Sequence, residues 1–259
     1  MAANKPGNLC ATNAEPIDDG THCLFRSPSP GPSVLYTFFE DKFLIGVGLV
    51  EKNLRLSISA IMPKTLSALD FEDAARSLGS HIDVNLLHAF STVESGGKSG
   101  FGPTGLPIIA YEGHIFRKYT HKKYDKDYPL LSYHYVKKAG TEWKKNNKDQ
   151  VTAWNTLNAA IALDEIAALK SCSWGMFQLM GFNYESCGYK DVKGFVAAMK
   201  ASERGQLDAF VGFCKKRRGM VDAMRNKDFA TMAMLYNGKD YGDYDQRIRK
   251  AYKKLIHKS

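Results

Sequence analysis

The sequence lacks any apolar run approaching the ~20 residues that a membrane-spanning helix needs, so we expect no membrane insertion. Its first stretch, MAANKPGNLCATNAEPIDDG, has neither the basic start nor the apolar centre of a secretory signal. We therefore expect a protein that is made in the cytoplasm without a signal peptide. A target outside the cytoplasm would require another route of delivery.

Metal-binding patterns are also missing. The five cysteines show no CxxC spacing and the seven histidines include no HExxH motif, which argues against a zinc enzyme. We expect neither a metal nor another cofactor. Small buried thiols are the simplest interpretation of the cysteines. An oxidising destination would permit a disulfide between Cys10 and Cys23. It would equally permit one pair among Cys172, Cys187 and Cys214, and the odd number leaves at least one thiol free.

Acidic residues are outnumbered in one part of the chain only. The net charge is +9, and residues 1–68 hold six basic and six acidic residues, so the excess falls in residues 69–259. This part should be drawn to a polyanion. The basic residues are scattered and show no zinc-finger, homeodomain or RRM pattern, so we expect no nucleic-acid partner. The bacterial cell wall is another anionic polymer.

The composition is that of a globular chain, with 44% hydrophobic and 24% charged residues. Residues 1–66 form an N-terminal segment of unknown role, in which SPSPGPS reads as a linker. Two or three short β-strands are predicted within 34–50 and 53–61. Residues 67–259 show helical periodicity. The sequence therefore predicts a mostly α protein with a small β-containing N-terminal part.

Helix signals begin at Ser67, which forms a weak capping box with Asp70 and precedes a helix that ends at Gly79. A second helix has Ile82, Leu86, Phe90 and Val93 on one face and carries Glu94 in its last turn. Residues 100–145 are expected to form loops with short elements. Further helices are predicted over about 151–170, 192–200, 203–217, 228–236 and 243–256.

Glu94 stands at the end of an apolar helical run and is followed by Ser95-Gly96-Gly97. The negative end of the helix dipole and an apolar neighbourhood both raise the pKa of a carboxyl group. A protonated acid at neutral pH can serve as a general acid. The glycines would let a bulky polymer approach it. On the local sequence alone, a solvated glutamate before a glycine cap is the simpler interpretation.

Three further motifs change this balance. Glu94-Ser95, then Gly-Met-Phe-Gln at 175–178, then Tyr236-Asn237-Gly238 resemble, in that order, the goose-type lysozyme and soluble lytic transglycosylase superfamily. The longer stretches VESGGKSGFGPTGLPIIAYEGHIF, SCSWGMFQLMGFNYESCGY and FVAAMKASERGQLDAFVGF resemble the N-acetylmuramidase family of phage endolysins and related wall-degrading proteins. The resemblance covers about 69–255. Residues 1–66 do not resemble the helical peptidoglycan-binding module often found in front of this domain.

The resemblance implies a lysozyme-like α-helical catalytic domain in which Glu94 protonates the glycosidic oxygen between N-acetylmuramic acid and N-acetylglucosamine. Glu112, in AYEGHIF, falls where the family has an FERHIF-like stretch and is our candidate for the second carboxylate. A structural glutamate that pairs with Arg117 or with a backbone amide is an equally good interpretation. A lytic transglycosylase, in which the 6-hydroxyl of the substrate attacks, stays open.

Substrate-binding residues follow from the same resemblance. Ser173, Gly175 and Gln178 would line the groove, because a glutamine amide can both donate to and accept from an N-acetyl group. Tyr236 would lie beside the acid, and Asn237 forms at least a turn. The aromatic and sulfur side chains within this motif are expected to be core, and the nearby histidine is expected to be structural: Trp174, Met176, Phe177 and His114.

Several biological roles remain open. A peptidoglycan hydrolase without a signal peptide could be an endolysin that passes through a holin pore. It could also be an antibacterial effector exported by a type VI secretion system, with a cognate immunity protein and a docking contact to the secretion apparatus. The unfamiliar segment 1–66 favours the effector. A non-catalytic wall-binding protein is the alternative from another class. The basic C-terminal YDQRIRKAYKKLIHK suits either a solvated helix face or an anionic wall.

Overall fold

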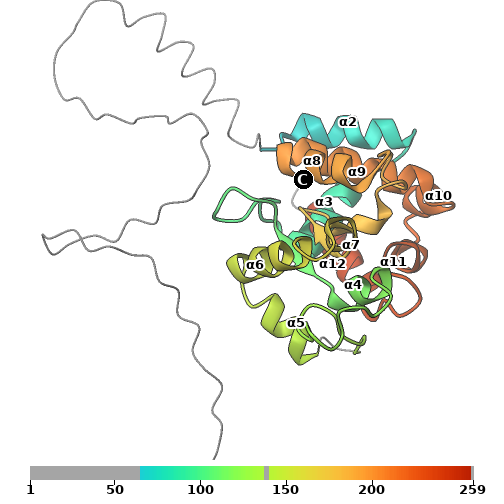
Figure 1. Ribbon diagram of the computed structural model, residues 1–259. Helices are drawn as coiled ribbons and strands as arrows, with labels where there is room; N and C mark the ends of the chain where they lie inside the picture. The colour runs from blue at the N-terminus through green and yellow to red at the C-terminus, as the bar shows by residue number, and fades with distance from the viewer. Residues whose placement is uncertain (1–64, 137–139, 258–259) are drawn as a thin grey trace, which may run out of the picture. The chain divides into compact units, whose positions relative to one another are not determined.

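The computed structural model describes residues 65–136 and 140–257, in which α-helices accompany one small antiparallel sheet (Figure 1). The expectation of a mostly α protein is confirmed. The strands expected within 34–61 lie outside the described residues. The division into 1–66 and 67–259 stays a prediction.

The helices follow one another in chain order from α2 to α12. They are α2 (Ala68–Leu78), α3 (Val84–Ser95), α4 (Gly113–Tyr119), α5 (Thr141–Asn146), α6 (Gln150–Ile161), α7 (Glu165–Lys170), α8 (Val192–Ala201), α9 (Glu203–Lys216), α10 (Met220–Arg225), α11 (Phe229–Asn237) and α12 (Tyr244–Ile256), with a 3₁₀ turn at Gly181–Asn183. No helix in the described parts of the chain is both long and apolar enough to cross a membrane.

The first two helices form as their sequence signals predict. The capping box of α2 is complete, because the Ser67 side chain accepts from the backbone N–H of Asp70 and the Asp70 side chain accepts from the backbone N–H of Ser67. In α3, Leu86 and Phe90 are fully buried on the predicted face. Figure 1 shows α2 lying over α8 and α9, which agrees with its contacts to α9.

The single helix predicted over about 151–170 is wrong, because two helices, α6 and α7, replace it. The chain leaves the helical path between Ile161 and Glu165. There the Asp164 side chain accepts a hydrogen bond from the N–H of Ala167 and begins a new helix as its N-cap. An apolar face that continues across such a break looks like one helix in the sequence, while the aspartate is the actual start signal.

The small sheet was not predicted. It comprises β1 (Ile109–Tyr111), β2 (Cys172–Trp174) and β3 (Leu179–Met180), in the order β1-β2-β3. Strands of two or three residues are too short to show a period of two. Helix α10 also escaped prediction.

The packing of α12 along α3 joins the last described helix to the helix that carries Glu94. Beneath this contact, Phe90 packs against Phe210 of α9 and Tyr236 of α11. Phe177 stacks on Phe210 with ring centroids 4.3 Å apart. Trp174, Met176 and Phe177 are all buried, as expected for core residues: they are 0%, 5% and 1% exposed.

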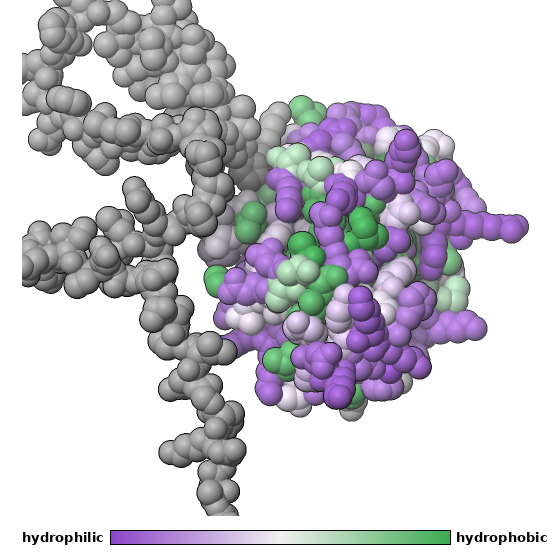
Figure 2. All heavy atoms as spheres, in the orientation of Figure 1, coloured by the Kyte–Doolittle hydropathy of each residue, from purple (hydrophilic) through white to green (hydrophobic). Residues whose placement is uncertain are grey.

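The three cysteines of the described region are buried and free: Cys172, Cys187 and Cys214. Burial raises the pKa of all three thiols. No disulfide therefore joins any two of them, and the buried-thiol interpretation is confirmed for these three. Cys10 and Cys23 lie outside the described residues. The face of the molecule seen in Figure 2 is mainly hydrophilic, with small apolar areas between.

Candidate active site

Glu94 lies in the last turn of α3, just before the chain turns away. Gly96 takes the left-handed conformation at φ 67° as the C-cap, and Gly97 repeats it at φ 73°, which suits glycine far better than other residues. A Cβ atom at either glycine would meet no atom within 4 Å. Both glycines therefore face open space in the loop that follows the acid.

The carboxyl group of Glu94 is partly buried. Burial raises its pKa from 4.5 to about 7, while a hydrogen bond from Tyr244 and the positive charge of Arg247 act in the opposite direction. The pKa moves as expected from the sequence, but desolvation is the first cause. Glu94 is thus an acid that holds its proton close to neutral pH.

Tyr244 is the residue that contacts this acid, and sequence reasoning missed it. It begins α12, is 3% exposed, and its hydroxyl donates to Glu94 Oε1. Arg247, one turn later, donates from Nη2 to the carbonyl oxygen of Val93 at 3.1 Å. Its guanidinium also lies 5.8 Å from the centre of the Tyr244 ring. The sequence signal that could have identified Tyr244 is an aromatic residue at the start of a helix rich in basic residues.

Tyr236, which the resemblance placed beside the acid, stands one ring further away. It stacks on Tyr244 with centroids 5.9 Å apart and planes 4° from parallel. Its hydroxyl donates to the carbonyl oxygen of Phe177. Burial and the charge of Glu94 raise its pKa. Asn237 is exposed and ends α11, and Gly238 follows with φ 86°.

Ser173, Gly175 and Gln178 come together in one hydrogen-bonded turn between β2 and β3. Ser173 Oγ donates to Gln178 Oε1 at 2.7 Å, and Gln178 Nε2 donates to the carbonyl oxygen of Gly175 at 2.8 Å. Both Gly175 and Gln178 have positive φ, 69° and 44°. For Gln178 this is a strained conformation, of a kind that clusters at functional sites.

Glu112 follows β1 and precedes α4. Its carboxylate accepts from Trp143 Nε1 at 2.8 Å through Oε1, and His114 Nδ1 lies 3.3 Å from Oε2. The alternative in which Glu112 pairs with Arg117 is wrong, because Arg117 Nε donates to Asp125 instead. His114 thus contacts Glu112 itself, and the centroid of its ring lies 5.0 Å from that of the Tyr135 ring.

The register of the sheet places Glu112 and Ser173 on the same face. Ala110 is opposite Ser173, and the N–H of Glu112, two residues on, donates to the carbonyl oxygen of Ser171. Alternate residues of a strand share a face. The other face is core, with Tyr111 and Trp174 both 0% exposed. One face of the sheet thus belongs to the core, and the other carries Glu112 and Ser173, of which Ser173 is itself buried at 7% exposure.

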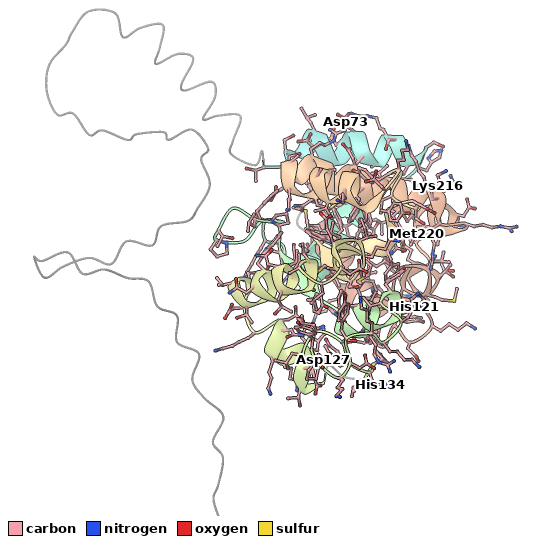
Figure 3. All side chains as sticks on the ribbon, viewed as in Figure 1. Asp73, His121, Asp127, His134, Lys216 and Met220 are labelled. Carbon is pink, nitrogen blue, oxygen red and sulfur yellow. The ribbon has the colours of Figure 1, made fainter. Side chains whose placement is uncertain are left out.

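Metal ligands do not gather within residues 65–136 and 140–257, where no group of three histidine, cysteine, aspartate or glutamate side chains could hold an ion. Figure 3 shows His121 and His134 at the periphery of the molecule, and both are exposed.

Known proteins with this arrangement identify the chain. The family model for N-acetylmuramidase matches residues 83–256. The chain belongs to the N-acetylmuramidase family. The crystal structure of the Burkholderia AP3 phage endolysin is also similar, with a TM-score of 0.63 and 33% sequence identity over 80% of this chain and 78% of the endolysin chain. No curated protein matches.

Membership in this family confirms the lysozyme-like fold expected from the motifs. It also makes the chain a muramidase-type glycoside hydrolase, with peptidoglycan as its substrate. The matched residues contain every site residue discussed above, from Glu94 to Tyr244.

The raised pKa of Glu94 has a consequence for stability. The unfolded chain ionises this group near 4.5, whereas the folded protein keeps its proton until about 7. Between pH 4.5 and about 7 the folded protein holds one proton that the unfolded chain has released, so the free energy of unfolding falls as pH rises through this window. Above pH 7 the total loss is on the order of 3 kcal/mol at most. We expect Glu94→Gln to increase the free energy of unfolding at pH 8 but hardly at pH 4, as measured by urea denaturation.

The exposed Glu72 offers a matched control, because Glu72→Gln also removes one carboxylate but not a buried one. An equal gain for Glu94→Gln at both pH values, or no gain at pH 8, would contradict a Glu94 pKa of about 7 in the folded protein.

Proposed function

We propose that the chain cleaves the β-1,4 bond between N-acetylmuramic acid and N-acetylglucosamine, with Glu94 as the general acid. The observation that carries the proposal is a partly buried carboxyl group with a pKa of about 7 beside an open glycine loop. A carboxylic acid with this pKa is still largely protonated where ordinary glutamates have ionised. A protein that only bound the wall would gain nothing from such an acid.

Proton transfer is aided by the groups that surround the acid. Glu94 gives its proton to the glycosidic oxygen as the bond to the muramic acid carbon breaks, and the 4-hydroxyl of N-acetylglucosamine leaves. Glu94 is then a carboxylate. The Tyr244 hydroxyl and the Arg247 charge both favour the ionised form. They therefore stabilise the acid after it has lost its proton, which lowers the free energy of the charge-separated state.

Glu112 is the second carboxylate in this proposal. Its position on the same sheet face as Ser173, which bonds to Gln178, supports a place in the substrate groove. The contacts from Trp143 and His114 fix its orientation. As a base it would activate the water that attacks the sugar. Without it, the substrate's own 6-hydroxyl would attack and leave an anhydro end, the lytic transglycosylase alternative.

The products distinguish these reactions. Wild-type protein incubated with purified peptidoglycan should release fragments with reducing-end N-acetylmuramic acid, identified by mass spectrometry. Glu94→Gln should release none, because the amide cannot donate the proton, and Glu112→Gln should slow release by about 100-fold or more. Anhydro ends would assign the transglycosylase reaction and remove Glu112 from the mechanism. A folded wild type that releases no fragment would leave the wall-binding alternative.

The contact between Tyr244 and Glu94 predicts a change in pH dependence. The hydroxyl lowers the pKa of Glu94, so its loss in Tyr244→Phe should raise that pKa and extend activity to higher pH. The measurement is the pH profile of kcat/KM. Tyr252→Phe is the matched control, since the Tyr252 hydroxyl bonds to Asp83 on the same helix pair. An alkaline limb that does not move, or moves equally in the control, would disprove the role of Tyr244.

We propose further that the chain acts as an endolysin, released through a pore made by a second protein. The similarity to the AP3 phage endolysin supports this role. The effector alternative rests on residues 1–66 and on partners of another kind, an immunity protein and a secretion apparatus.

Expression in bacteria separates the two routes. An endolysin should lyse the producing cell only after a holin is induced, and removal of residues 1–64, which keeps Leu66 and its bond to Glu203, should leave that lysis unchanged. Killing of neighbouring cells without lysis of the producer, lost on removal of residues 1–64, would establish the effector instead. Lysis would be followed as culture turbidity and killing as surviving colonies.

A further inference from the structure

Glu203, the first residue of α9, is a carboxylate buried at 2% exposure and far in sequence from its partners. Its Oε1 accepts from Ser99 Oγ at 2.5 Å and from the N–H of Gly100 at 3.1 Å. Its Oε2 accepts from the N–H of Leu66 at 3.0 Å. Two of these three donors belong to the loop that directly follows Glu94, which we call the 96–100 loop.

Gln206, one turn further along α9, is 1% exposed and forms hydrogen bonds with a second segment as well. Its Oε1 accepts from the N–H of Met176 at 2.7 Å. Its Nε2 donates to the carbonyl oxygens of Met199, at 3.1 Å, and of Gly100, at 3.4 Å. One amide thus holds both the 96–100 loop and the turn that carries Gln178, which we call the 175–178 turn.

The two segments have glycines where they meet this amide. A Cβ atom on Gly100 would lie 1.8 Å from Gln206 Oε1, and a Cβ atom on Gly175 would lie 2.5 Å from Gln206 Cδ. The segments are also bonded through one residue between them. Ile108 donates its N–H to the carbonyl oxygen of Gly100 and accepts from the N–H of Gly175, at 2.9 and 2.8 Å.

From this geometry we infer that Glu203 and Gln206 are positioning residues, which set the spacing between the 96–100 loop and the 175–178 turn and so hold Glu94 and Gln178 in their working arrangement. The inference rests on the proposed function of Glu94. Neither side chain bonds to Glu94 or to Gln178. They act through the rest of their segments, above all through the N–H groups of Gly100 and Met176, whose hydrogen bonds are buried. Loss of either acceptor would leave a buried donor unpaired, which costs free energy.

A second route leads from the 175–178 turn to the acid. The carbonyl oxygen of Phe177 accepts from Tyr236, whose ring stacks on Tyr244, and Tyr244 donates to Glu94. A shift of the turn would therefore disturb the tyrosine that contacts the acid as well as the glutamine. Small displacements of this kind are enough to cost about 100-fold in rate.

The test compares three variants in the full chain. Gln206→Met keeps the side-chain volume but loses every hydrogen bond, Gln206→Glu keeps the acceptor for Met176 but loses the donor, and Glu203→Gln alters the other residue. Asp208→Asn is the matched control on the same helix, because Asp208 is exposed and pairs only with Arg204. The measurements are kcat and KM on soluble peptidoglycan fragments, the pH profile, and thermal unfolding.

We expect kcat to fall about 10- to 100-fold in Gln206→Met and in Glu203→Gln, with KM changed less than about threefold. The alkaline limb of the pH profile should move to higher pH, because a displaced 175–178 turn would weaken, through Tyr236, the Tyr244 hydrogen bond that lowers the pKa of Glu94. Gln206→Glu should lose at least as much activity as Gln206→Met, because a buried carboxylate would then face the carbonyl oxygens of Gly100 and Met199. Asp208→Asn should match the wild type.

Normal kcat and an unmoved pH profile in Gln206→Met and Glu203→Gln, with both folded at the assay temperature, would overturn the inference and leave the proposed function intact. So would a loss of activity that appears only near the unfolding temperature. An inactive wild type would overturn the proposed function, and the inference with it.

Discussion

The site depends on one contact, the packing of α12 on α3, which covers the carboxyl group of Glu94. Two opposed effects meet there. Burial raises the pKa of the acid, while Tyr244 and Arg247 of α12 lower it. A glutamate with burial alone would hold its proton too firmly, and one with the two polar groups alone would lose it too early. Because Tyr244 and Arg247 both belong to α12, the acidity of the site depends on the packing of this helix.

The other candidate residues lie in loops and in the short sheet. Glycines 96 and 97 face open space in the loop that follows Glu94. The short sheet presents Ser173 and Glu112 on one face and gives its other face to the core. Helix α9 ties the 96–100 loop and the 175–178 turn together with two polar side chains that are almost wholly buried. Polar groups buried in this way cost stability unless they are fully bonded, and each of these two side chains makes three hydrogen bonds.

Much of this could be predicted from the sequence, and the failures have physical reasons. Helices with caps and a clear apolar face, such as α2 and α3, were found because their signals are local. The break at Asp164 was missed because the apolar pattern continues across it. Strands of two or three residues carry no usable period. The candidate site residues came from ordered motifs, whereas Tyr244, Glu203 and Gln206 act through contacts between distant parts of the chain. The wrong partner for Glu112 has the same origin, since Trp143 is 31 residues away in sequence.

Because the chain is synthesised from its N-terminus, the contact between Tyr244 and Glu94 can form only late in synthesis. The two residues are 150 positions apart, and α12 is the last described helix. A ribosome therefore completes α3 long before the helix that covers its acid exists. Until α12 has emerged and packed, Glu94 lacks the Tyr244 hydroxyl and the Arg247 charge that tune its acidity. A partly synthesised or C-terminally shortened chain without α12 would therefore carry the Glu94 motif without these two groups.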